Sequence, residues 1–107
     1  MVVLRFDQQP DFALRAGRAN HQPAPGVDGV LFGDIHQHTV HSDGTGGVEQ
    51  VYRRARCQLG HDLCAVTDHE RLGKRCLGPV TWRYQLEAAD AYDDPGRFVT
   101  LRAYEFT

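Results

Sequence analysis

Histidines and carboxylates gather in three short stretches of this chain. His36 and His38 lie two residues apart, and Asp43 follows them closely. The pair 68–69, an aspartate and a histidine, comes later, and Glu105 lies near the end of the sequence. Imidazole and carboxylate groups without thiolates are typical ligands of Zn, Mn or Fe. We therefore predict a site for divalent metal ions in which these stretches converge.

Each of these residues also has an ordinary structural explanation. An isolated His-x-His pair occurs by chance, and Asp43 in Ser-Asp-Gly is a common turn residue. Asp68 could cap the next segment or orient His69 without touching a metal, and Glu105 could be a surface charge. These explanations together require several coincidences at strand ends, so we favour the metal site. For His41, a contact with a metal or phosphate and a simple loop position both stay open.

The elements that position these residues follow from the apolar pattern. Strands are predicted at 30–36, 63–67 and 98–104, and each ends at one of the candidate stretches. Two helices are predicted between them by apolar residues at helical spacing. The first has its apolar residues at Val48, Val51, Tyr52, Ala55 and Leu59, with Gly60 as its left-handed cap, and the second at Trp82, Leu86 and Ala89.

Alternating strands and helices predict an α/β fold with right-handed crossovers and a parallel sheet. Ligands bind at the carboxyl ends of such strands, so all three stretches should reach one rim of the sheet. The middle strand is apolar on both faces, which is typical of a strand covered on both sides. Residues 1–29 are expected to be an irregular arm or linker with a short strand at 2–6, and residues 30–107 form the domain. A polar loop is expected at 70–79.

Composition limits the class of protein. The 107 residues, 41% hydrophobic and 24% charged with a net charge of -2, fit one small globular domain. There is no basic stripe for nucleic acid and no apolar run of membrane-spanning length, so neither partner is expected. Three irregularly spaced cysteines argue against a disulfide framework, and no signal peptide is visible. A reducing, cytoplasmic location is therefore expected.

Three motifs of this chain resemble those of the PHP family, which is named for its polymerase and histidinol-phosphatase members. Residues 34–44 follow the pattern D-[LI]-H-x-H-T-x-x-S-D-G, and residues 65–69 follow [AI]-x-T-D-H. Residues 95–107 are similar to the third motif, with Ala103 where the family usually has glycine. The resemblance covers about residues 30–107 and is strongest to a poorly characterised bacterial branch of PHP-like phosphoesterases.

This resemblance implies the N-terminal portion of a distorted TIM-like (β/α)7 barrel with up to three divalent ions. His36, His38 and Glu105 would hold the first ion, and Glu105 would bridge to the second. The third ion would bind Asp43 and His69. The implied reaction is hydrolysis of a small-molecule phosphate ester by a metal-bound hydroxide. The implied catalytic residues are Asp68, His69 and Glu105, with Asp68 beside the metals rather than on them.

Two alternatives stay open at this point. The chain contains about three of the family's seven strands, so it is expected to be a truncated form that is inactive alone. It would then be a non-catalytic metal-binding remnant or a fragment, and its unpaired sheet edge would favour self-association. The other alternative is a metal hydrolase of the amidohydrolase type. That class also carries His-x-His at the end of a first strand, but usually needs a later lysine.

Overall fold

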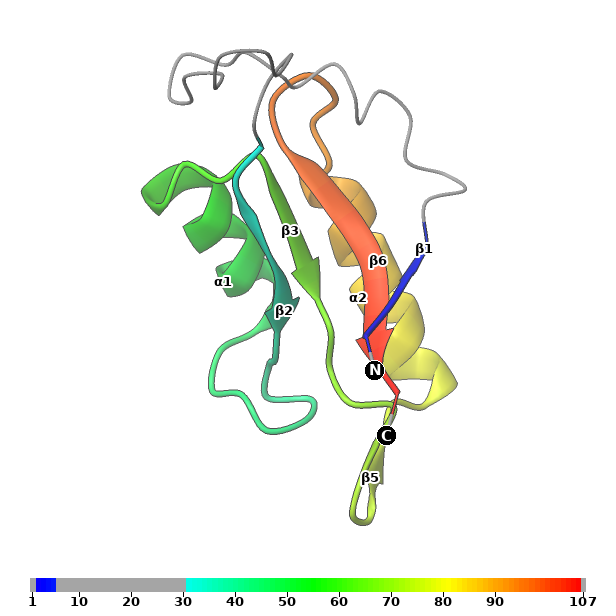
Figure 1. Ribbon diagram of the computed structural model, residues 1–107. Coiled ribbons are helices and arrows are strands. Elements are labelled where there is room, and N and C mark those ends of the chain that lie inside the picture. Colours follow the sequence, from blue (N-terminus) through cyan, green and yellow to red (C-terminus); the bar gives the residue numbers. More distant parts are fainter. Residues whose placement is uncertain (1, 6–30, 107) are drawn as a thin grey trace.

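The computed structural model describes residues 2–5 and 31–106, so most of the expected arm at 1–29 lies outside the described residues. The main sheet has four strands in the order β1-β6-β3-β2 (Figure 1). Its three parallel strands are β2 (Gly33–Gln37), β3 (Leu63–Val66) and β6 (Val99–Glu105). The α/β alternation, with three parallel strands and two main helices, is therefore confirmed. Figure 1 shows that these three strands end on the same side of the molecule.

The short strand expected near the start of the chain is present as β1 (Val2–Arg5). It runs antiparallel to β6, with Val2 opposite Glu105 and Arg5 opposite Arg102. The β6 edge of the parallel sheet therefore has a partner strand. The sequence pattern did not indicate this pairing, because it depends on backbone hydrogen bonds between the two ends of the described chain.

Both helices cover the same face of the sheet. Helix α1 (Val48–Arg53) continues directly into a π-helical segment, η2 (Arg54–Gln58), and α2 (Pro79–Tyr92) follows the second parallel strand. One core cluster joins the helices to this face. It contains Val48, Tyr52, Ala55, Cys64, Val66, Ala88, Ala89 and Phe98. A second cluster, Leu63, Ala65, Val99, Leu101 and Ala103, lies on the opposite face, which confirms that β3 is buried on both sides.

The expectation that Leu59 belongs to the core stripe is wrong. Its side chain is 53% exposed, whereas Tyr52 and Ala55 are buried. The wider π-helical turn explains the difference, because hydrogen bonds to the fifth rather than the fourth residue rotate later side chains off the stripe. Gly60 has a φ of 64°, which confirms the predicted left-handed cap.

The first strand, predicted at 30–36 from its apolar residues, is shorter than that range and is not a buried strand. The strand begins at Gly33, and Phe32 and Ile35 are 50% and 43% exposed. Two features account for this exposure. First, β2 is the edge strand of the sheet. Second, its register with β3 shifts between Asp34 and Gln37, so that one extra residue is accommodated and the alternation of faces is interrupted.

The expected polar loop at 70–79 contains a small hairpin. Its strands are β4 (Arg71–Leu72) and β5 (Arg75–Cys76), and Gly73 in the connecting turn has a φ of 60°. Glycine adopts this left-handed conformation without the steric cost that a Cβ atom brings. The hairpin separates β3 from α2.

No helix in the described part of the chain combines the length and apolar character that crossing a bilayer requires.

Candidate metal centre

The ends of the first and third parallel strands bring three predicted ligands to a common point. Glu105 Oε2 lies 3.0 Å from His36 Nε2 and 2.9 Å from His38 Nε2. Ligand atoms that share one zinc ion at about 2.0–2.2 Å are typically about 3 Å apart. These three side chains therefore have the spacing of a common coordination sphere.

A second group of potential ligands adjoins the first. His38 Nδ1 lies 2.5 Å from Asp43 Oδ1, and Asp43 Oδ2 lies 3.6 Å from His69 Nε2. His69 Nδ1 also lies 3.6 Å from Glu105 Oε2. Together, the five predicted ligands form one continuous cluster at the strand ends, with His38 belonging to both groups.

Two histidine nitrogens in this cluster are buried without a hydrogen-bond partner among the described residues. They are His38 Nε2 and His69 Nδ1. Such unsatisfied buried groups are rare in proteins, and a bound ion or water commonly satisfies them. His38 Nε2 lies 2.9 Å from Glu105 Oε2, and His69 Nδ1 lies 3.6 Å from the same oxygen. The donor set and its unpaired nitrogens therefore fit a divalent metal ion.

The carboxylates of the cluster are held in their ionised form. A hydrogen bond from His38 lowers the pKa of Asp43, and a hydrogen bond from His36 lowers the pKa of Glu105. When His38 carries its proton on Nδ1, it donates to Asp43 and keeps the Nε2 lone pair free. A carboxylate behind a ligating imidazole orients the ring in this way in many metal sites.

Asp68 lies outside both ligand groups. Its carboxylate is completely buried and accepts hydrogen bonds from the Thr39 amide at 2.7 Å and the Thr39 hydroxyl at 2.6 Å. Ser42 donates a third at 2.6 Å, and the Gln85 side chain of α2 donates a fourth. Asp68 thus ties the loop that carries Asp43 to the end of β3 and to α2.

Gly44 is a residue that the sequence analysis did not single out. The loop folds back so tightly that a Cβ atom here would lie 2.2 Å from the His38 carbonyl oxygen. The Gly44 amide also donates to the Thr39 carbonyl at 2.8 Å. Only glycine permits this approach, which holds Asp43 beside His38. In the sequence, the position of this glycine directly after Ser42 and Asp43 could have indicated a tight turn.

His41 does not join the cluster. Its ring lies 5.6 Å from the ring of Tyr84 in an edge-on arrangement. The Tyr84 hydroxyl donates to Glu49 Oε2 at 2.5 Å, and this hydrogen bond lowers the pKa of Glu49 while raising that of Tyr84 to about 12. His41 therefore belongs to a contact between the loop and the two helices.

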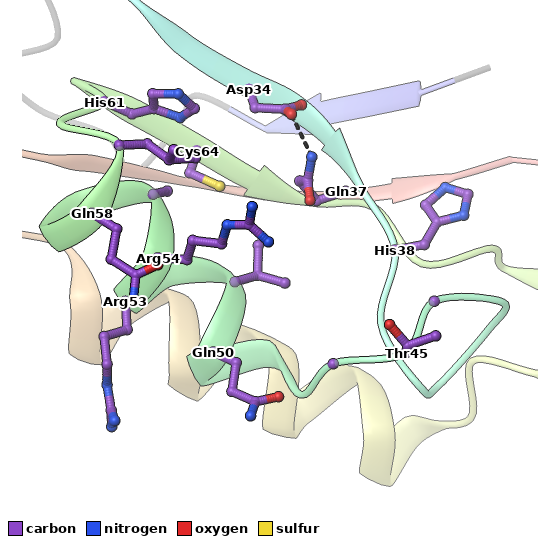
Figure 2. Close-up of a pocket in the computed structure, with 15 residues that line it drawn as sticks. Asp34, Gln37, His38, Thr45, Gln50, Arg53, Arg54, Gln58, His61 and Cys64 are labelled. Atoms are coloured by element: carbon purple, nitrogen blue, oxygen red, sulfur yellow. Dashed lines mark hydrogen bonds between the residues drawn. The ribbon is translucent and has the colours of Figure 1, made fainter.

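A polar pocket of about 850 Å³ lies between β2 and the α1–η2 segment. Figure 2 shows His38 at one end of this pocket and His61 at the other, with Arg54 extending from the helix towards β2. Asp34 and Gln37 on β2 are joined by a hydrogen bond, drawn as a dashed line in Figure 2. The side chain of His61 is only partly exposed, and its Nδ1 is buried.

The family comparison covers the second part of this site. Residues 48–107, more than half of the chain, match the family model described as "Protein of unknown function (DUF3604)". The chain belongs to the DUF3604 family. The matched DUF3604 region contains Asp68, His69 and Glu105, whereas the His-x-His pair and Asp43 precede it. No curated protein and no solved structure matches the chain.

Proposed function

We propose that this DUF3604 chain forms the metal-binding part of a PHP-like phosphoesterase. In this proposal, β2, β3 and β6 are three strands of a distorted TIM-like barrel with seven strands. One observation carries the proposal: side chains from three separate strand ends meet within ligand distance, and two of their buried imidazole nitrogens make no hydrogen bond with the described residues. The motifs that resemble the PHP family, at 34–44, 65–69 and 95–107, supply these side chains.

The cluster has room for more than one ion. His36, His38 and Glu105 would hold one ion, and Asp43 with His69 would hold another. Glu105 Oε2 lies 2.9 Å from His38 Nε2 and 3.6 Å from His69 Nδ1, so this carboxylate would be available to either group of ligands. Divalent ions would supply Lewis acidity that activates water and neutralises the phosphoryl oxygens of an ester.

The chain's own residues have distinct roles in this proposal. Glu105 and His69 touch the reacting centre as ligands, whereas the buried carboxylate of Asp68 acts through the 39–44 loop and is a positioning residue. Asp43 both orients His38 and offers its second oxygen towards His69. The ionised carboxylates would balance the positive charge of bound ions, and neutral imidazoles would complete the coordination.

The metal content of the purified chain is the first test. We expect near-stoichiometric Zn, Mn or Fe by elemental analysis, and loss of that metal in a His36→Ala/His38→Ala variant. A His61→Ala variant is the matched control, because His61 lies at the far end of the pocket and should leave the metal content unchanged. Absence of metal from the wild-type chain, after exposure to each ion, would contradict the proposed centre.

The reaction is tested separately from the metal. Metal-dependent hydrolysis of p-nitrophenyl phosphate, lost in the His36→Ala/His38→Ala variant and kept in the control, would support the phosphoesterase. Stoichiometric metal without hydrolysis of any phosphate ester would contradict the phosphoesterase and favour a non-catalytic metal-binding chain. Metal-dependent hydrolysis of amides or lactones alone would favour the amidohydrolase type.

A further inference from the structure

A basic hairpin stands beside the candidate metal centre. Three of the six residues from Arg71 to Cys76 are basic, and none is acidic. They are Arg71, Lys74 and Arg75, and Lys74 is exposed in the turn between β4 and β5. Figure 1 shows the hairpin projecting from the molecule on the side where the parallel strands end.

The base of the hairpin is attached to two of the predicted metal ligands. It begins immediately after His69, which forms a parallel bridge with Glu105. The amide of Glu70 donates to the Glu105 carbonyl oxygen at 2.8 Å. The amide of Leu77 then donates to the Glu70 carbonyl oxygen at 2.8 Å, which closes the base of the hairpin. These bonds fix the direction in which the hairpin leaves the centre.

The length of the hairpin sets its reach. Strand residues advance about 3.3 Å each, so the turn at Gly73 and Lys74 lies on the order of 10 Å from the base at Glu70. Lysine and arginine bind phosphate oxygens through charge-assisted hydrogen bonds. The positive end of α2, which starts at Pro79 directly after the hairpin, adds to the positive potential there.

We propose that this hairpin selects substrates with two phosphate groups. One phosphate of a bisphosphorylated small molecule would lie at the metal centre, and the hairpin would bind the other. The placement of one phosphate at the metal centre rests on the proposed function, but the binding of the other phosphate by the hairpin does not. Asp43 and Glu105 make the centre itself acidic, so a phosphate needs metal to bind there. The hairpin carries its positive charge without metal, and the two contributions can therefore be measured apart.

Two matched probes test the inference by titration calorimetry. Hexyl phosphate and hexanediol bisphosphate share one alkyl chain and differ in the second phosphate. We expect the zinc-loaded chain to bind the bisphosphate about tenfold more tightly, a gain typical of one or two charge-assisted contacts. In an Arg71→Gln/Lys74→Gln variant, this preference should fall to about twofold, the statistical advantage of two equivalent ends.

The matched control is an Arg53→Gln/Arg97→Gln variant. It also removes two positive charges, but from exposed sites away from the hairpin, one on α1 and one just before β6. This variant should keep the wild-type preference for the bisphosphate. A wild-type preference no greater than the statistical one would overturn the inference. Equal preference in the wild type and the hairpin variant would also overturn it.

Titrations of the metal-free chain separate this inference from the proposed function. The bisphosphate should bind more weakly there than to the zinc-loaded chain, and the hairpin variant should still reduce that binding severalfold. Hairpin-dependent binding that zinc does not change would support the hairpin and contradict the metal centre. Zinc-dependent binding of both probes that the hairpin variant leaves unchanged would support the centre and overturn the role of the hairpin.

Discussion

Asp68 connects three parts of the site through a single carboxylate. Its donors come from the loop after β2 and from α2, and the group is fully buried. A buried carboxylate is tolerated only where several donors replace its hydration, and each donor in turn depends on it. The arrangement of the ligands around His38 and Asp43 is therefore sensitive to a residue that touches neither.

Replacing Asp68 tests this dependence. An Asp68→Ala variant removes the acceptor of the buried Thr39 amide and hydroxyl, so we expect its free energy of unfolding to fall by about 3 kcal/mol or more. Urea denaturation measures this change. The control is Asp90→Ala, which removes an exposed ion pair with Arg102 and should cost about 1 kcal/mol or less. Equal losses in the two variants would contradict a central role for Asp68.

The Tyr84–Glu49 hydrogen bond makes a pH-dependent contribution to stability. Its effect is to lower the pKa of Glu49 below its usual 4.5 in the folded chain. The contribution is therefore complete above the pKa of the unfolded state and is lost as the pH falls through the folded-state value. The contribution of Tyr84 to stability depends on pH in the opposite direction. Its pKa is raised to about 12, so this contribution is lost as the pH rises above 10.0 towards that value.

A Tyr84→Phe variant isolates this hydrogen bond. We expect the difference in free energy of unfolding between wild type and variant to be constant near neutral pH and to shrink below the usual pKa of Glu49. Urea denaturation at a series of pH values measures the difference. In parallel, the Glu49 carboxyl should titrate closer to 4.5 in the variant, as followed by NMR. An unchanged Glu49 titration curve would contradict the assignment.

The loop from Thr39 to Gly44 is the element that turns a His-x-His pair into a cluster. It leaves β2, reverses within a few residues and returns Asp43 to the ring of His38. The reversal needs a residue without Cβ at Gly44, because backbone atoms of His38 occupy the space where Cβ would lie. The geometry of the second ligand group therefore depends on backbone packing in this loop.

A Gly44→Ala variant tests the role of the loop. The added Cβ would lie 2.2 Å from the His38 carbonyl oxygen, so the loop must move. We expect a loss of about 2 kcal/mol in stability and weaker zinc binding, measured by urea denaturation and calorimetry. Gly78→Ala is the control, since nothing lies within 4 Å of a Cβ there and its φ is -67°. Unchanged zinc affinity in Gly44→Ala would contradict this account.

The two edges of the parallel part of the sheet differ in their strand pairing. The β6 edge is paired with β1, whereas β2 pairs with β3 on one side and has no strand partner among the described residues on the other. The β2 edge is not a regular template for another strand. Its register shifts between Asp34 and Gln37, and the amide of His36 donates to Asp34 Oδ1 at 2.9 Å. Bulges and side chains that occupy backbone groups are common protection against edge-to-edge association.

Removing this protection should promote self-association, the behaviour expected from the open sheet edge. In an Asp34→Ala variant, the His36 amide loses its acceptor, so we expect a larger dimer fraction at high concentration in sedimentation velocity. Asp34→Asn is the matched control, because it removes the charge but keeps an oxygen acceptor, and it should behave as the wild type. Equal association of the two variants would assign the effect to charge rather than to the backbone amide.

The sequence alone determined the order of strands and helices, the five ligand candidates and the rim where they meet. These features depend on local patterns, because periodic burial fixes each element and a parallel sheet collects its strand ends at one side. Only the tertiary structure decided that β1 pairs with β6, that β2 is an exposed edge, and that Asp68 holds the 39–44 loop. Such features depend on contacts between distant segments, which side-chain periodicity does not record. The unpaired nitrogens of His38 and His69 belong to this second group.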